Sequence, residues 1–165
     1  MNKADFFRKI QKKFSTTYYY STKLFPANIR SRVQVLYAFL RYADEIVDNP
    51  TADPKTALNH FEQEFWKLWE SFHKTQNFEE LELSIQPKSS TFTVLEGTFI
   101  NQEFIKLAFE LGFSPNWIKA FFHSMSLDFT VARYNKYQDL LDYIYGSAEV
   151  VGLMMNKIMG GTEAA

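Results

Sequence analysis

Apolar residues recur every three or four positions along most of the chain, a spacing that predicts amphipathic helices. One such helix is predicted to begin at Asp53 and Pro54, a typical cap and first helical residue. Ser114 and Pro115 repeat this start signal for a second helix. A third helical pattern extends from about Gln138 to Met159. The residues at helical spacing are Leu58, Phe61, Phe65, Leu68, Trp69 and Phe72 in the first, Ile118, Phe121, Phe122 and Met125 in the second, and Tyr143, Ser147, Val150, Val151 and Met154 in the third.

Strands are not expected, because strict alternation of apolar and polar residues is not sustained anywhere in the sequence. The 165 residues include only 6 Gly and 5 Pro, and the glycine patterns of nucleotide-binding loops are absent. Residues 77–90 are polar at both ends and lack a clear period, so they are predicted to form a connection. The sequence therefore predicts an all-α fold, and its length fits a single domain over residues 1–165.

Positions 37 to 48 carry polar chemistry at helical spacing. A phenol, a guanidinium and two carboxylates follow one another at intervals of four, three and four residues, so they share one side of a helix. Apolar residues repeat about 100° away around the same helix, which places the polar side chains beside a core. The polar stripe consists of Tyr37, Arg41, Asp44 and Asp48, and the apolar residues are Leu36, Leu40, Ala43 and Val47.

Two explanations of the paired acids are open. Asp44 and Asp48 could form a solvated helix face, with Asn49 and Pro50 ending the helix. Acids in the last turn of a helix are disfavoured by the helix dipole, by about 0.3–1 kcal/mol each, and the two also repel one another. A positive partner would compensate for both effects, and a hard divalent cation is a natural candidate because it accepts carboxylate oxygens.

Charge and composition exclude several classes of protein. The 18 basic and 19 acidic residues give no basic field of the kind that binds nucleic acid. The chain has no cysteine, which excludes disulfides, thiolate catalysis and cysteine zinc sites. The N-terminal residues lack the apolar core of a signal peptide, and no run of about 18 apolar residues is present. We expect a cytoplasmic protein.

The N-terminal segment is compatible with two locations. Its predicted helix has an aromatic and aliphatic side and a basic side. Such a helix can lie on an anionic membrane surface, or it can be an ordinary surface helix of a folded protein. Membrane association therefore stays open beside the cytoplasmic expectation. The apolar side consists of Phe6, Phe7, Ile10 and Phe14, and the basic side of Arg8, Lys9, Lys12 and Lys13.

Hydroxyl groups gather directly after this helix. Ser15, Thr16, Thr17 and Ser21 lie beside three consecutive tyrosines. Hydroxyls near the start of a helix are often only caps. They can also hold diphosphate oxygens, particularly where an arginine such as Arg41 offers a bidentate contact.

The C-terminal half adds two ambiguous features. Asp128 continues the apolar face that follows Ser114, so it either lies at a partly wet helix end or turns into an enclosed polar site. Gly146 and Gly152 lie inside a predicted helix, where glycine costs about 1 kcal/mol relative to alanine. Close approach of a neighbouring backbone or a ligand would explain them, and so would plain helix packing. Aromatic residues make up 18% of the chain, enough for a wide core and also for the wall of an apolar pocket.

The order of these segments resembles the squalene and phytoene synthase family of head-to-head prenyl transferases, closest to the bacterial phytoene synthases. The sequence F-S-T-T of Phe14–Thr17 is similar to the family's H-S-x-S. The sequence Y-A-F-L-R-Y-A-D-E-I-V-D of Tyr37–Asp48 is similar to Y-x-x-x-R-x-x-D-D-x-x-D. Asp128 and the sequence Y-I-Y-G-S-A-E-V-V-G of Tyr143–Gly152, which is similar to Y-C-Y-x-V-A-G-x-V-G, complete the resemblance.

The resemblance implies an isoprenoid-synthase-type helical bundle and a magnesium-dependent reaction, with manganese able to replace magnesium. The preferred reaction would be condensation of two geranylgeranyl diphosphates to phytoene, with condensation of two farnesyl diphosphates to squalene or dehydrosqualene as the alternative. Only a squalene synthase would need NADPH. An aromatic-lined cavity would protect the allylic cation from water. The implied residues are Asp44 and Asp48 as metal ligands, Phe14, Ser15, Thr16, Thr17, Tyr37 and Arg41 as substrate-binding residues, and Tyr143, Asp128 and Arg41 as catalytic residues.

Two substitutions and one missing motif depart from the family pattern. Phe14 replaces the common histidine, and Glu149 stands where many relatives have glycine. The family's second aspartate-rich segment has no counterpart before Ala165, where Thr162 would begin another helix. We therefore expect the chain to be the N-terminal part of a truncated synthase domain that is inactive by itself. The alternative is a non-catalytic helical assembly or binding protein of the same superfamily. The sequence does not indicate an oligomeric state.

Overall fold

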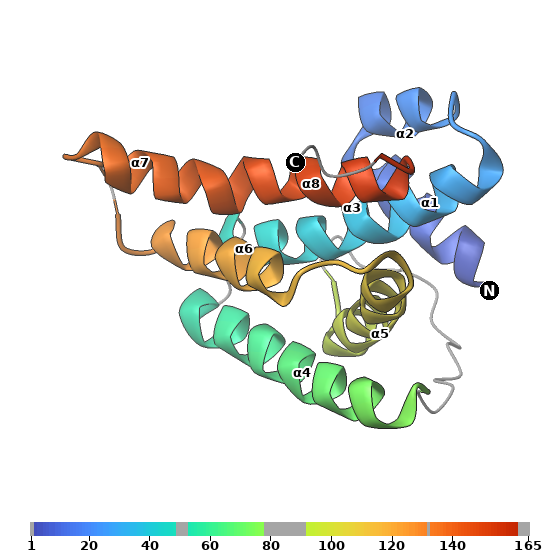
Figure 1. The fold of residues 1–165 in the computed structure, drawn as a ribbon, viewed down its shortest axis with the longest axis horizontal. Coiled ribbons are helices and arrows are strands. Elements are labelled where there is room, and N and C mark those ends of the chain that lie inside the picture. The colour runs from blue at the N-terminus through green and yellow to red at the C-terminus, as the bar shows by residue number, and fades with distance from the viewer. Residues whose placement is uncertain (1, 49–52, 78–91, 132, 162–165) are drawn as a thin grey trace.

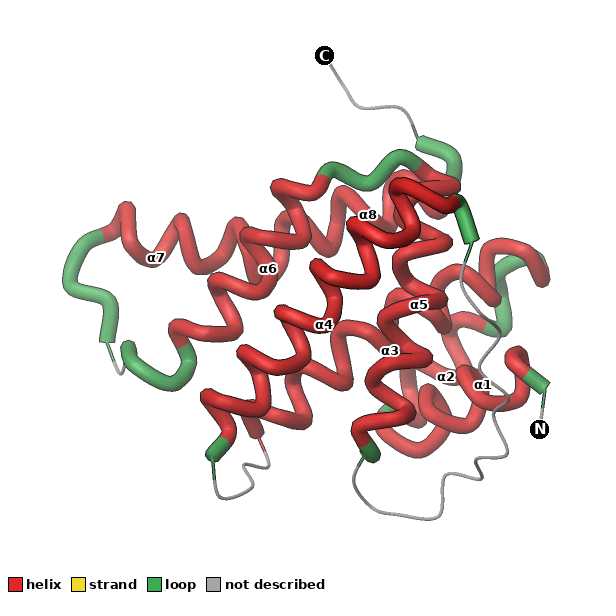
Figure 2. Tube along the Cα trace, turned by 90° about the horizontal axis from the view of Figure 1, so that it is seen from below, coloured by secondary structure: helices red, strands yellow, loops and turns green. Residues whose placement is uncertain are grey.

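The computed structural model describes residues 2–48, 53–77, 92–131 and 133–161, and these residues form helices joined by short loops (Figures 1 and 2). No strand occurs in these ranges, so the predicted all-α fold is confirmed. Part of the predicted connection 77–90 and the helix start at Thr162 lie outside the described residues, as do Asn49 and Pro50. The helices are α1 (Lys3–Phe14), α2 (Thr16–Thr22), α3 (Ala27–Asp48), α4 (Pro54–Thr75), α5 (Val94–Leu111), α6 (Pro115–Leu127), α7 (Tyr137–Ile144), the π-helix η1 (Tyr145–Glu149) and α8 (Val150–Ile158).

Helix α3 lies in the middle of the molecule, with α4 on one side and α7 and α8 on the other (Figure 1). It packs against α1, α4 and α5, and more weakly against α6 and α8. Its buried surface is wider than the predicted apolar stripe. Leu36 and Ala43 are buried as expected, whereas Leu40 and Val47 are only half-buried, because the deepest face is centred on Phe39.

The helix start signals read from the sequence are confirmed. The side chain of Asp53 accepts a hydrogen bond from the backbone N–H of Thr56, and α4 begins at Pro54. Ser114 caps α6 in the same way. Helix α5 begins with a capping box and ends at Gly112, whose φ of 65° favours glycine. The spacing of apolar residues does not single out α5, because this helix is buried on several sides.

Aromatic rings fill the core around α3. The Phe39 side chain is fully buried, and its ring stacks on Phe104 of α5 with 3.9 Å between centroids and 3° between planes. Rings from α4 and α6 surround this pair at centroid distances of 5.5–5.8 Å, namely Phe61, Phe65, Phe121 and Phe122. Much of the aromatic surplus is thus core.

The apolar side of α1 belongs to the same interior. Phe6, Phe7 and Ile10 are at most 2% exposed, and the rings of Phe6 and Phe7 contact Phe99 of α5. This side of α1 is therefore not free to enter a bilayer, which favours the surface-helix interpretation. Across the described ranges, no helix has the combined length and apolar character needed to span a membrane.

The predicted C-terminal helix is continuous from Tyr137 to Ile158, with one π-helical turn at Tyr145–Glu149. Gly146 lies in this turn against α6, where an added Cβ would overlap the backbone carbonyl of Ala120. At Gly152, apart from its own helix backbone, no described residue comes within 4 Å of a built Cβ. Close approach of a neighbouring backbone is therefore confirmed for Gly146, whereas the described residues show no such neighbour at Gly152.

These two glycines give a matched pair of variants. Gly146→Ala is expected to lower the free energy of unfolding by about 1–3 kcal/mol, because a backbone carbonyl cannot turn aside as a side chain can. Gly152→Ala is expected to raise it by about 0.5–1 kcal/mol, because alanine favours the helix. Urea unfolding followed by circular dichroism measures both changes, and equal effects would contradict the packing of η1 against α6.

Candidate active site

The polar stripe lies on one side of α3 as predicted. Tyr37, Arg41 and Asp44 are half-buried, whereas Asp48 is the last residue of the helix and is exposed. The Asp48 side chain is 63% exposed. The stripe therefore runs from the protein interior towards solvent at the end of α3.

Arg41 contacts groups on both sides of the stripe. Its Nη2 donates to Oε2 of Glu45 at 2.6 Å, and its Nη1 lies 3.9 Å from Oδ2 of Asp48. Its guanidinium carbon lies 5.0 Å from the centre of the Phe14 ring, at the end of α1. The guanidinium is thus held among two carboxylates and an aromatic face, where a cation is favoured.

The junction of α1 and α2 adds donors to the stripe. Ser15 caps α2, accepting from the backbone N–H of Tyr18 at 3.2 Å, and its hydroxyl faces the Tyr37 phenol. Burial raises the pKa of Tyr37, against the lowering effect of Arg41 and the slighter one of Ser15. The Tyr18 ring stacks on Tyr37 at 5.4 Å. Thr16 and Thr17 lie in the first turn of α2 with exposed side chains.

Asp128 and Tyr143 meet at the turn between α6 and α7. Asp128 follows α6 and is exposed, so the expectation of an enclosed carboxylate is wrong and that of a wet helix end is confirmed. Burial raises the pKa of the Tyr143 phenol, and a hydrogen bond with Asp128 raises it further. The Tyr134 ring lies 5.3 Å from that of Tyr143. Tyr143 therefore keeps its proton at neutral pH.

Asp44 links this turn to the stripe. Burial raises its pKa, Arg41 opposes this effect, and the charges of Asp48, Asp128 and Glu45 raise it further. The electrostatic influence of Asp128 on Asp44 indicates that the stripe and the α6–α7 turn face the same region. Negative charge accumulates in this region around Arg41.

The raised pKa predicts how Asp44→Asn changes stability. A carboxyl whose pKa is higher in the folded state contributes stability below its unfolded pKa, and this contribution is lost as the pH rises through the folded pKa. At pH 7 the metal-free chain holds Asp44 in its disfavoured charged form, so Asp44→Asn should raise the melting temperature there. The gain should shrink below about pH 3, where aspartate is neutral in both states. Thermal unfolding in a chelator tests this sign, and a less stable variant at pH 7 would contradict it.

The donor set fits a magnesium ion only as part of a larger site. Asp44 and Asp48 are one helical turn apart, and Asp48 makes a long contact of 3.9 Å with Nη1 of Arg41. The described residues contain no group of three or more acidic or histidine side chains placed to hold a metal by themselves. Magnesium commonly takes one or two protein carboxylates and completes its shell with water and substrate phosphates.

Among the described residues, the aromatic rings near the stripe form packed core and do not line an open cavity beside Asp44. The phenylalanines around Phe39 pack against one another. A cavity of about 570 Å³ lies instead between α3, α4 and the start of α5, lined by Tyr42, Glu45, Phe61 and Phe92 among others. Asp44 and Tyr143 are not among its lining residues.

Glu45, Tyr18 and Tyr134 join the site without having been predicted from the sequence. Glu45 could have been identified from its spacing, because it lies four residues after Arg41 and oppositely charged residues four apart meet on a helix. Tyr18 and Tyr134 reach the site through the packing of separate segments. The sequence holds no local pattern that would have identified these two.

Comparison of the sequence with known proteins identifies its relatives. The family model described as squalene/phytoene synthase matches residues 11–165. The phytoene synthase of Arthrospira platensis is 29% identical over 161 residues, covering 94% of this chain and 44% of the relative. The 15-cis-phytoene synthase of Pantoea ananas is 28% identical over 143 residues, covering 85% of this chain and 41% of the relative. The chain thus spans less than half the length of these relatives.

Proposed function

The chain belongs to the squalene/phytoene synthase family, and on this premise we propose that its polar stripe binds a prenyl diphosphate for head-to-head condensation. The observation that carries the proposal is the grouping of the stripe with Ser15 and with the Asp128–Tyr143 pair. It combines hydrogen-bond donors for an anion with carboxylates for a cation. Geranylgeranyl diphosphate is the preferred substrate, because the relatives named above are phytoene synthases.

The donors of the site have a distinct role in this proposal. The free side of the Arg41 guanidinium, the Tyr37 phenol and the Ser15 hydroxyl would donate to diphosphate oxygens and orient the prenyl group. A tyrosine phenol is protonated at neutral pH, and burial raises the pKa of Tyr37 further, so this group acts as a donor and not as an anion. These contacts would strengthen as charge develops on the leaving diphosphate.

The acids and Tyr143 complete the arrangement. Asp44 and Asp48 would hold magnesium, which when bound supplies positive charge that neutralises the diphosphate and eases cleavage of the allylic carbon–oxygen bond. Manganese would satisfy the same oxygen ligands. The Tyr143 phenol, hydrogen-bonded to Asp128, would lie beside the reacting carbons and steer them.

Equilibrium binding of radiolabelled geranylgeranyl diphosphate to the 165-residue chain tests the proposal. We expect saturable binding that needs Mg²⁺ and disappears in a chelator. We also expect no condensation product from these residues by themselves, because they contain a single aspartate pair of the D-x-x-x-D type implied by the resemblance. Phytoene in the extract would contradict that second expectation. A folded chain that shows no Mg²⁺-dependent binding would favour the non-catalytic alternative.

A further inference from the structure

Glu45 lies beside the polar stripe, and its side chain is largely buried. It follows Asp44 directly, and its side chain is only 11% exposed, against 63% for Asp48. A carboxylate this deeply placed needs a positive partner, because burial disfavours its charged form. The partner is Arg41, whose Nη2 donates to Glu45 at 2.6 Å. Glu45 therefore makes a much shorter contact with Arg41 than Asp48 does.

Phe14 holds the same guanidinium by its face. The Arg41 guanidinium carbon lies 5.0 Å from the Phe14 ring centre. The Phe14 ring is itself fixed, because it stacks on Phe92 with 4.9 Å between centroids and 21° between planes. A stacked ring and a short ion pair thus constrain Arg41 from two directions.

These two contacts decide where the remaining donors of Arg41 point. A guanidinium is rigid and planar, so fixing Nη2 and one face of the plane also fixes Nη1. Nη1 is the nitrogen that lies on the side of Asp48. A free arginine side chain loses rotamer entropy on binding an anion, and an arginine already held in place loses less.

We propose that Glu45 is a positioning residue: its carboxylate holds Arg41 so that Nη1 is directed at the diphosphate. The inference rests on the proposed function, and it assigns a role to the second acid of the D-E-I-V-D sequence that is separate from metal binding. The opposing view is that Glu45 only offsets the charge of Arg41. In that case its removal would strengthen anion binding, because a negative charge near the anion would disappear.

A double-mutant cycle separates the two views. The probe is inorganic pyrophosphate with Mg²⁺, titrated calorimetrically into the 165-residue chain and into Glu45→Ala, Glu45→Gln, Arg41→Ala and Arg41→Ala/Glu45→Ala. We expect Arg41→Ala and Glu45→Ala each to weaken binding on the order of 10-fold, as loss of a charge-assisted contact or of its support does. Glu45→Gln should lose less, because its amide oxygen can still accept from Arg41. The double variant should bind no more weakly than Arg41→Ala.

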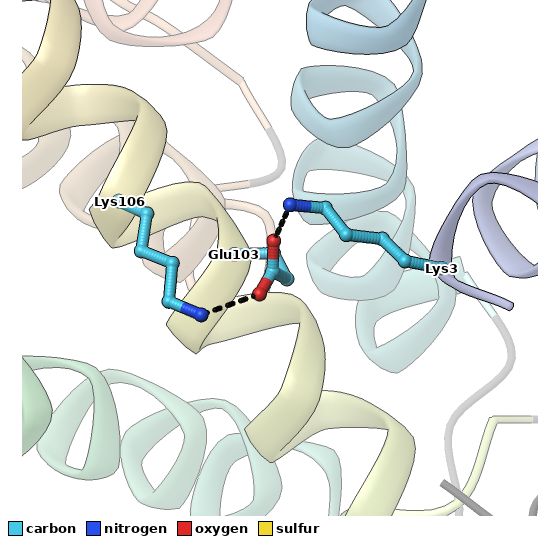
Figure 3. Close-up of polar contacts among 3 residues, drawn as sticks. All are labelled: Lys3, Glu103 and Lys106. Carbon is cyan, nitrogen blue, oxygen red and sulfur yellow. Dashed lines mark hydrogen bonds and ion pairs between the residues drawn. The ribbon is translucent and has the colours of Figure 1, made fainter. Parts of the chain in front are cut away.

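Glu103→Gln is the matched control for loss of a buried carboxylate. Glu103 of α5 is 4% exposed and forms ion pairs with Lys106 at 2.8 Å and with Lys3 at the start of α1 (Figure 3). This variant should lower the melting temperature and leave pyrophosphate affinity unchanged. If Glu45→Ala does not fold, Glu45→Gln with and without Arg41→Ala supplies the cycle.

The possible results distinguish failure of the positioning role of Glu45 from failure of the proposed diphosphate site. Unchanged or tighter pyrophosphate binding by the Glu45 variants, or an equal further loss in the Arg41→Ala background, would overturn the positioning role while leaving the proposed function intact. An Arg41→Ala chain that binds pyrophosphate as well as the unmodified chain would instead count against the diphosphate site itself.

Discussion

Replacing Phe39 by alanine is expected to lower the free energy of unfolding by about 3–5 kcal/mol. The side chain is fully buried, and its ring stacks on Phe104 at 3.9 Å. Rings from α4 and α6 close around the pair, so several helices would face the resulting cavity. Because such rings interdigitate closely, the surroundings can relax only in part. Guanidinium unfolding at 25 °C measures the change.

Tyr137→Ala is the control for loss of an aromatic ring. The Tyr137 side chain is 75% exposed at the start of α7, so its removal should change stability by no more than about 0.5 kcal/mol. A loss below about 1 kcal/mol for Phe39→Ala would show that the core is not centred on α3.

Replacing Asp44 and Asp48 together by asparagine is expected to weaken Mg²⁺-dependent binding of geranylgeranyl diphosphate on the order of 100-fold or more, since even outer groups around a metal change affinity by 10–100-fold. Asparagine keeps the shape of aspartate and removes the charge that attracts the cation. Binding measured without Mg²⁺ should change little or increase slightly. Equilibrium dialysis over a range of Mg²⁺ concentrations gives both values.

Glu70→Gln is the surface control for carboxylate neutralisation; it removes one negative charge, where the double variant removes two. Glu70 is an exposed residue of α4, so its neutralisation alters net charge without touching the stripe. Its affinity should equal that of the unmodified chain. Full retention of Mg²⁺-dependent affinity by the Asp44/Asp48 variant would remove these residues from the metal site.

Local chemistry explains which parts of the structure the sequence predicted. The caps at Asp53 and Ser114 act within three residues of themselves, and the stripe on α3 follows from helical spacing. Helix α5 gives a weaker pattern, because residues all around it are buried and no polar face marks its period. Fold class and helix starts are therefore local properties of this chain.

The assembly of the site depends on tertiary packing. Spacing alone could not bring Asp128 beside Tyr143, or Ser15 beside Tyr37, because these residues belong to different helices. The resemblance to a known family supplied those expectations. It did not supply the Glu45–Arg41 contact, which depends on how deeply α3 sets that side chain. Glycine in a helix also did not distinguish Gly146, which meets a neighbouring backbone, from Gly152, which has no such neighbour among the described residues.

Crystals of the chain grown with pyrophosphate and Mn²⁺ would show whether Asp44 and Asp48 hold a metal ion against a bound diphosphate, because manganese scatters anomalously and satisfies the same oxygen ligands as magnesium. We expect an anomalous peak beside the carboxylates of Asp44 and Asp48, with the pyrophosphate in contact with Arg41. A peak at other side chains, or pyrophosphate bound away from α3, would contradict it.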